Sequence, residues 1–178
     1  MGLDRAHIEA FVDGAWHQAA DMTHLGSGQR HERTVFAYDV DYAVDHLEAS
    51  DRRAVSRRFP VRFDVHTFEH FPAFSIDLLV QGEARRMLVA DLKRSGVRAT
   101  EWSLLLAGAA SPVGNLRIHE SLPQEKPTPR GVTRDEVVRR GEGFRQWARQ
   151  EQIPTAGASD TQGAAPKLLL TEDCQGLL

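Results

Sequence analysis

An Asp-Gly dipeptide, Asp13-Gly14, constrains the fold of the first part of this chain more than any other feature of its sequence. Apolar residues recur at every second position of His7–Val12 before it, and Ala15–His17 follows it. A two-residue turn between strands needs backbone with positive φ, which glycine adopts without steric cost. The sequence therefore predicts that these two segments pair as an antiparallel β-hairpin.

Residue patterns further along the chain alternate between those of strands and those of helices. Branched, aromatic and alternating residues predict strands at Thr34–Tyr38, Phe59–Thr67 and Asn115–His119. Caps, proline and apolar residues three and four positions apart predict helices at residues 40–47 after the capping Asp39, Pro72–Leu79, Glu83–Arg94 and Thr100–Ala110. Residues 26–28 and 48–58 are typical of loops. We therefore expect an α+β fold, in which helices pack on a small antiparallel, hairpin-rich sheet.

Three prolines and a glycine in residues 121–131 divide the chain. We expect residues 1–120 to form the α+β domain and residues 121–132 to form a proline-rich linker. Residues 133–178 are expected to hold a helix and a final strand, Lys167–Thr171. Thr133 and Glu136 have the spacing of a capping box, which predicts the start of that helix.

Charge and composition argue against several function classes. The net charge of −3 and the isoelectric point of about 6.2 argue against a nucleic-acid partner. We interpret the local basic run of Arg52, Arg53, Arg57 and Arg58 as a solvated loop. Cys174 is the single cysteine, so the chain has no intramolecular disulfide. No apolar run reaches the ~18 residues of a membrane span, and the N-terminus lacks a signal-peptide pattern, so we expect a cytoplasmic protein.

The side chains that could carry chemistry each have a simpler structural interpretation. His66 and His70 have the spacing of a helical metal-ligand pair, but they lie at the end of a predicted strand without a third ligand. Ser75 and Ser103 lie in apolar helices outside any G-x-S-x-G motif, which predicts packing or capping roles. Cys174 lies in a terminal stretch that does not favour a nucleophile. The sequence therefore assigns no catalytic residue and no metal site.

Tryptophan is enriched where proteins bind one another, and this chain has Trp16, Trp102 and Trp147. Trp102 stands at the start of an apolar helix, so we expect it to pack in the core. Trp16 directly follows the predicted hairpin turn, where an exposed aromatic side chain could bind a partner.

Small residues before the final strand, in residues 162–167, could approach a phosphate group. The loop contains Gln162, Gly163, Ala164 and Lys167, and backbone N–H groups in such a loop can bind phosphate oxygens. A plain loop that enters a strand has the same composition. From the residues alone, both interpretations stay open.

The order of five segments resembles the N-terminal part of the HipA-type serine/threonine kinases, which are the toxins of bacterial toxin–antitoxin pairs. The segments are IEAFVDGAW, VFAYDVDYA, FPAFSIDLLVQGEARRML, PVGNLRI and TQGAAPKLLLTED. Together they extend from Ile8 to Asp173. One departure is Val80, where the family commonly has proline before the glycine turn.

The resemblance implies a small α+β subdomain that packs on a larger kinase domain. It implies that residues Gln162, Gly163, Ala164 and Lys167 are the remnant of a glycine-rich, nucleotide-facing loop. In the family this loop often carries a regulatory phosphorylation site, for which Ser159 or Thr161 is the nearest hydroxyl here. The ATP-positioning lysine, catalytic aspartate and metal-binding acids of the family all follow this loop, so ATP and Mg²⁺ are implied only for a complete kinase.

The resemblance implies a non-catalytic regulatory or interaction unit, truncated from such a kinase. The implied partners are a HipA-like kinase core, a helix-turn-helix antitoxin, or both. Alternatives are a separately encoded, antitoxin-like protein that restrains a kinase core, a chain that counts as a kinase only by family membership, and an adaptor unrelated to kinases. The continuation of the chain beyond Glu120 favours truncation over a separate partner.

We predict that the purified chain transfers no phosphate from ATP, because the groups that position and activate the nucleotide are not in its sequence. Incubation with radiolabelled ATP and Mg²⁺ checks this, with a complete kinase as positive control. Incorporation of label into the chain, or into an added protein substrate, would contradict the non-catalytic interpretation.

Overall fold

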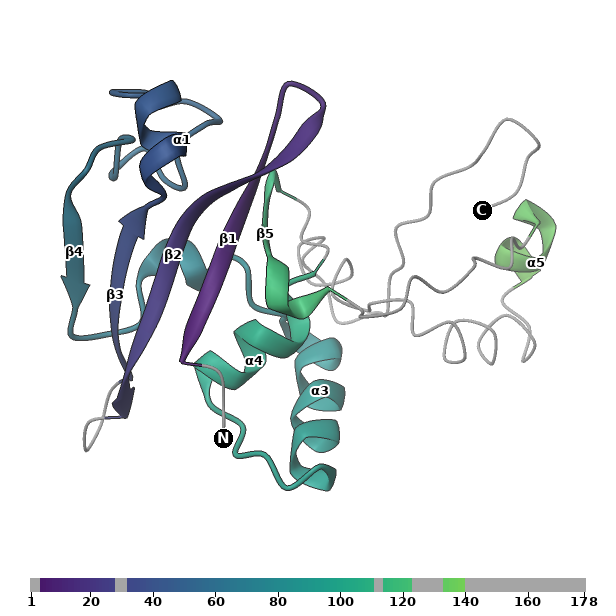
Figure 1. Cartoon of the computed structure of the whole chain (residues 1–178). Helices are drawn as coiled ribbons and strands as arrows, with labels where there is room; N and C mark the ends of the chain where they lie inside the picture. The colour runs from purple at the N-terminus through teal and green to yellow at the C-terminus, as the bar shows by residue number, and fades with distance from the viewer. Residues whose placement is uncertain (1–3, 28–31, 111–113, 123–132, 140–178) are drawn as a thin grey trace.

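The computed structural model describes residues 4–27, 32–110, 114–122 and 133–139, which form an α+β fold around an antiparallel sheet. Its five strands have the order β4-β3-β2-β1-β5, so β5 returns to pair with β1 (Figure 1). The strands are β1 (Arg5–Val12), β2 (Ala15–Ser27), β3 (Glu32–Tyr38), β4 (Val65–Phe68) and β5 (Leu116–Ile118). The predicted class, an α+β fold with an antiparallel sheet, is confirmed.

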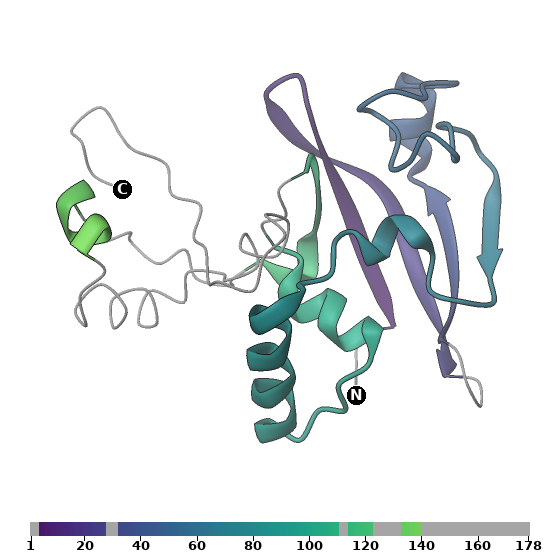
Figure 2. The same cartoon turned by 180° about the vertical axis from the view of Figure 1, so that it is seen from behind.

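Helices pack on one face of this sheet. Figure 2 shows α2 crossing in front of the strands, with α3 and α4 near the lower end of the sheet, whereas Figure 1 views the opposite face. The helical segments that the structure describes are α1 (Val40–Asp45), α2 (Ala73–Ile76), α3 (Gly82–Arg94), α4 (Glu101–Gly108), η1 (His119–Ser121) and α5 (Arg134–Arg139). None of these helices is long and apolar enough to cross a membrane.

The predicted hairpin at Asp13-Gly14 is confirmed, since both residues have positive φ (50° and 87°) and connect β1 directly to β2. Its second arm is longer than predicted. β2 continues to Ser27, inside the predicted loop at residues 26–28, because its last part pairs with β3. The register with β1 shifts between Ile8 and Glu9, where Ala19 is an extra, unpaired residue of a β-bulge.

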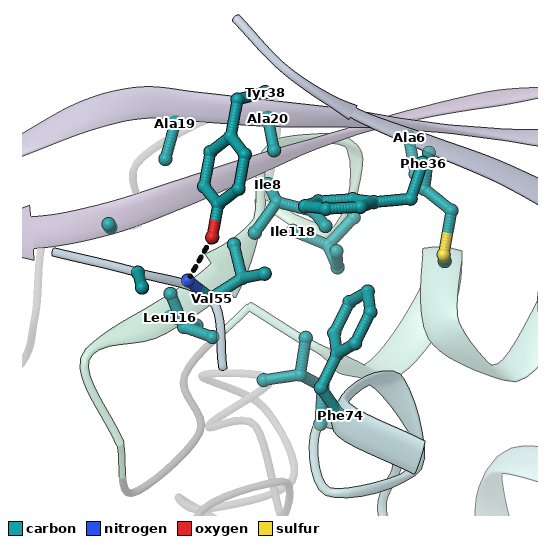
Figure 3. Close-up of a cluster of buried hydrophobic side chains, with 14 of the residues drawn as sticks. Ala6, Ile8, Ala19, Ala20, Phe36, Tyr38, Val55, Phe74, Leu116 and Ile118 are labelled. Atoms are coloured by element: carbon teal, nitrogen blue, oxygen red, sulfur yellow. Dashed lines mark hydrogen bonds between the residues drawn. The ribbon is translucent and has the colours of Figure 1, made fainter. Parts of the chain in front are cut away.

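The core lies between the sheet and the helices. Figure 3 shows Ile8 and Ile118 beside the rings of Phe36 and Phe74. The centroids of these two rings are 5.2 Å apart in an edge-to-face arrangement, which is favourable for aromatic side chains. The inward residues of β1 are at most 2% exposed, namely Ala6, Ile8, Ala10 and Val12.

Two tyrosines hold the loop after α1, Tyr38 from β3 and Tyr42 from α1 itself. The Tyr38 hydroxyl accepts a hydrogen bond from the Val55 backbone N–H at 3.1 Å (Figure 3). It also donates one to the Phe59 carbonyl. The Tyr42 hydroxyl donates to the Arg53 carbonyl at 2.7 Å. Burial raises the pKa of each hydroxyl to about 12. Both side chains therefore stay neutral in the folded protein well above the usual range of tyrosine.

The predicted strand at Phe59–Thr67 is wrong in its extent, because only its last three residues belong to β4. Its first part bonds back to the preceding loop. The Val61 backbone N–H donates to the Ala49 carbonyl, and the Val61 carbonyl accepts from the Glu48 N–H, both at 2.9 Å. Val61 is buried while Phe63 is exposed, although both were expected on one buried face.

The helix starts follow the side chains that cap them. Asp39 accepts hydrogen bonds from two backbone N–H groups in the first turn of α1, as predicted. Thr100 and Ser103 form a reciprocal capping box at the start of α4. The predicted capping box before α5 is also confirmed, since Thr133 donates its backbone N–H to the Glu136 carboxylate at 2.8 Å. Local sequence therefore determines where these helices begin.

We predict that Tyr38→Phe lowers the free energy of unfolding by about 1–3 kcal/mol, because the Val55 N–H then has no partner for its buried hydrogen bond. The matched control, Tyr42→Phe, leaves only a carbonyl unpaired and should cost about 1 kcal/mol. Urea unfolding followed by circular dichroism measures both.

Both tyrosine pKa values are higher in the folded protein than in the unfolded chain. Their contribution to stability is therefore present below pH 10 and is lost as the pH rises from there to about 12. Wild type should lose more stability over this interval than Tyr38→Phe does. Equal losses in the two proteins would contradict the assignment.

Candidate functional site

The residues that the resemblance assigns to a nucleotide loop lie outside the described residues. These are Gln162, Gly163, Ala164 and Lys167, together with the phosphorylation candidates Ser159 and Thr161. The predicted Lys167–Thr171 strand, Trp147 and Cys174 lie outside them as well. The site that geometry can support is therefore built from the α+β domain.

The structural roles expected for two serines are confirmed. The Ser75 hydroxyl is buried and donates to the Pro72 carbonyl at 2.7 Å. The Ser103 hydroxyl accepts from the Thr100 backbone N–H at 2.8 Å and caps α4. Each hydroxyl is used in a local hydrogen bond that supports the start of a helix.

His66 belongs to an aromatic cluster of the sheet. Its ring stacks on Phe36 with centroids 5.9 Å apart and lies 4.9 Å from the ring of Phe59. His70 is exposed beyond the end of β4. Across the described residues, no group of three or more His, Cys, Asp or Glu side chains is placed to hold a metal ion.

The outward side of β1 meets complementary side chains on both neighbouring strands. The register sets His7 opposite Asp21 and Phe11 opposite Trp16 on β2, and Glu9 opposite Arg117 on β5. Side chains at directly opposed positions lie on the same face and interact. We call this side of β1, β2 and β5, with Arg5–Asp21, His7–Asp21, Glu9–Arg117 and Phe11–Trp16 as its pairs, the open face.

One half of the open face is a chain of ion pairs around His7. Arg5 binds Asp21, and the His7 ring lies with Nε2 3.5 Å from an oxygen of the same carboxylate. The other ring nitrogen of His7 contacts Glu120 of η1, which also accepts the His7 backbone N–H at 2.9 Å. Glu120 thus binds both the backbone and the ring of His7, which links β1 to η1.

A second group of charges surrounds Glu9. Arg117 donates to its carboxylate, and the His119 ring nitrogen Nδ1 lies 2.9 Å from the other oxygen. Burial raises the pKa of Glu9, but the bonds from Arg117 and His119 outweigh burial, and the net effect lowers this pKa. Glu9 therefore stays ionised and holds β5 and η1 against β1.

An aromatic pair lies beside these charges, at the hairpin end of the open face. The rings of Phe11 and Trp16 are 5.3 Å apart and remain 42% and 36% exposed. The Arg117 guanidinium lies 4.0 Å from the centre of the Trp16 ring, within cation–π range. A shallow hollow of about 520 Å³ is lined by Phe11, Trp16, Gly114 and Asn115. We call this hollow the Trp16 groove.

The backbone at Asn115 is fixed from two sides. Its carbonyl accepts the Phe11 backbone N–H at 2.7 Å, and its side-chain amide donates to the Arg52 carbonyl. Arg52 itself binds Asp13 at the hairpin turn. The basic run that begins with Arg52 thus lies on the surface, as predicted, and its first residue supports the wall of the Trp16 groove.

A second hollow shares this wall. It has a volume of about 480 Å³, and Asp77 is one of its lining residues. Gly114 and Asn115 belong to the lining of both hollows. The other residues that line the second hollow come from α2 and neighbouring loops and from β5: Val55, Ser56, Ala73, Phe74, Leu78 and Leu116. The two hollows thus meet at Gly114 and Asn115.

The two described tryptophans differ as the sequence predicts. Trp102 is 5% exposed and packs in the core, so its structural role is confirmed. Trp16 is partly exposed, and binding of a partner by this side chain stays a prediction. The contributions of Arg117 and Asn115 were missed, because their place beside Trp16 depends on the pairing of β5 with β1, for which the local sequence has no signal.

Compared with known protein families and with curated proteins, the chain matches no family model and no curated sequence. The resemblance to the HipA-type kinases stays a prediction from the ordered segments of the sequence.

We predict that Arg117→Met raises the pKa of Glu9, because it removes the stronger of the two hydrogen bonds that favour the carboxylate. Carbon-detected NMR titration of the Glu9 carboxyl measures the change.

The stability that Glu9 contributes is present above the pKa of the unfolded chain and is lost as the pH falls through the lower folded value. The matched control, Arg5→Met, should leave the Glu9 titration unchanged, and an equal effect of both substitutions would contradict this assignment.

Proposed function

We propose that this chain is the non-catalytic, N-terminal interaction unit of a HipA-like toxin–antitoxin serine/threonine kinase, and that it binds the kinase core through the Trp16 groove. The observation that carries the proposal is the exposed Phe11–Trp16 pair beside a recess whose wall is held rigid. Its role is regulatory, since it supplies a docking surface and no catalytic group.

The composition of the Trp16 groove supports protein binding. Tryptophan and arginine are the residues that most often dominate the energy of protein interfaces, and here Arg117 lies over the ring of Trp16. Because Arg117 is also held by Glu9, its side chain is ordered before a partner arrives. Preordering reduces the entropy that binding costs. The groove therefore has the properties of an interface centre.

The position of the groove within the sequence supports the HipA-like part of the proposal. Phe11 and Trp16 belong to the segment IEAFVDGAW, and Gly114 and Asn115 belong to PVGNLRI. These are two of the segments by which the chain resembles the kinase family. All four lining residues of the Trp16 groove thus come from segments that carry the resemblance, which is what a shared docking surface requires.

The alternative of a separately encoded, antitoxin-like partner uses the same surface and differs in the arrangement of the genes. A helix-turn-helix antitoxin remains a further expected partner of the assembled kinase. DNA sequence beyond the Leu178 codon distinguishes the two arrangements. A continuing or displaced frame with the kinase residues indicates one broken kinase, and an intact neighbouring kinase-core gene indicates a split system.

We predict that the full chain binds a HipA-type kinase core that lacks its own N-terminal part, and that Trp16→Ser weakens binding about tenfold or more. Surface plasmon resonance with the immobilised core measures the affinity. The control, Met87→Ser, changes an apolar residue of α3 that is similarly exposed (47%) but lies outside the groove, and it should leave affinity unchanged.

Two results would overturn the proposal. One is the absence of binding by a wild-type chain that circular dichroism shows to be folded. The other is equal weakening by Trp16→Ser and Met87→Ser, which would place the contact away from the Trp16 groove.

A further inference from the structure

Exposed apolar side chains gather on α1 and on the segment that leads into β4. Val40 and Val44 are 65% and 63% exposed and lie one helical turn apart, and Leu47 continues the same spacing just beyond the helix. The opposite side of α1 is buried through Tyr42 and Ala43. α1 therefore has one apolar side in the core and another that faces outward.

The segment from Val61 to Phe63 adds one exposed apolar side chain, that of Phe63, near this area. The two backbone hydrogen bonds between Val61 and residues 48 and 49 fix it beside the end of α1. An ion pair of 2.8 Å between Glu48 and Arg62 adds a further link. Leu47 directly precedes Glu48, and Phe63 directly follows Arg62. Figure 1 shows α1 and the start of β4 at the same end of the sheet. We call Val40, Val44, Leu47 and Phe63 the α1 surface.

Acidic side chains border the α1 surface. Asp41 and Asp45 are exposed on α1, and Asp64 is exposed beside Phe63. Glu48 adds a fourth carboxylate, and Arg62 is the cation that it binds. Within residues 40–48 and 61–64, four carboxylates therefore stand against one guanidinium and the imidazole of His46. Two copies of the chain that met through this surface would bring like charges together, which opposes self-association.

From this charge and apolar pattern we propose that the α1 surface binds a basic amphipathic helix of a partner protein. The apolar side of such a helix would cover Val40, Val44 and Leu47, in the mode by which amphipathic helices bind apolar grooves. Its lysine or arginine residues would face Asp45 and Asp64. The site shares no residue with the Trp16 groove, so its partner is bound whether or not the groove binds a kinase core.

A pair of synthetic peptides tests the charge preference with the full chain. Both are 18-residue amphipathic helices with leucine at positions i, i+3, i+4 and i+7, and they differ only in having lysine or glutamate beside the leucines. Fluorescence anisotropy should show that the lysine peptide binds about tenfold more tightly than the glutamate peptide. The double variant Asp45→Lys with Asp64→Lys should reverse this preference. Lysine at position 45 lies in the last turn of α1, where a cation suits the helix dipole.

The double variant Val44→Ser with Leu47→Ser tests the apolar contribution, and it should lower the affinity for the lysine peptide about tenfold. Met87→Ser, an equally apolar-to-polar change on α3, should leave binding unchanged. Thermal unfolding shows that each variant is folded, and Trp16→Ser should leave the peptide affinity as it is.

Three results would overturn the proposal. The first is binding of the two peptides with equal affinity, or of neither, by the wild-type chain. The second is that the double variant Asp45→Lys with Asp64→Lys still binds the lysine peptide more tightly than the glutamate peptide. The third is a concentration-dependent dimer in sedimentation that Val44→Ser with Leu47→Ser abolishes, because this would assign the α1 surface to a second copy of the chain.

Discussion

The pairing of β1 on both of its edges is the constraint on which the rest of the structure depends. β2 binds one edge and β5, more than a hundred residues later in the chain, binds the other. Inward side chains of β1 form the centre of the core, and outward ones form the charged and aromatic pairs of the open face. Successive side chains of a strand point to opposite faces of the sheet, so the register that buries Ile8 on one face also brings Glu9 to Arg117 on the other.

The charged groups of the open face help to hold the short edge strand β5 on the sheet. β5 has only three residues and therefore few backbone hydrogen bonds. Glu9 and Glu120 compensate, since Glu9 of β1 accepts from the Arg117 side chain of β5 and Glu120 of η1 accepts from the His7 backbone N–H of β1. The bond to Glu9 also holds Arg117 over Trp16. Side chains thus hold a short strand in place, while the Phe11 N–H and the Arg52 carbonyl hold the adjoining wall of the Trp16 groove.

Local sequence predicted what local interactions determine. The Asp13-Gly14 turn and the Asp39 and Thr133 caps depend on residues within a few positions of each other, and all were found where expected. The strand expected at Phe59–Thr67 was wrong, because bonds from Val61 to the loop after α1 outweigh its alternating pattern. The Trp16 groove was predicted only through Trp16, since its other wall is brought there by pairing distant in sequence.

The extra residue at Ala19 has a consequence for how β2 presents its side chains. Ala19 and Ala20 are consecutive and both fully buried, so the strand changes the parity of its outward positions at this point. Trp16 is outward at an even position and Asp21 at an odd one, yet both face the same way as β1 residues opposite them. The bulge therefore acts as a phase shift between the turn and the rest of the sheet. Because of this shift, the aromatic pair near the turn and the ionic pairs further along the hairpin lie on the same face, although their residues on β2 differ in parity.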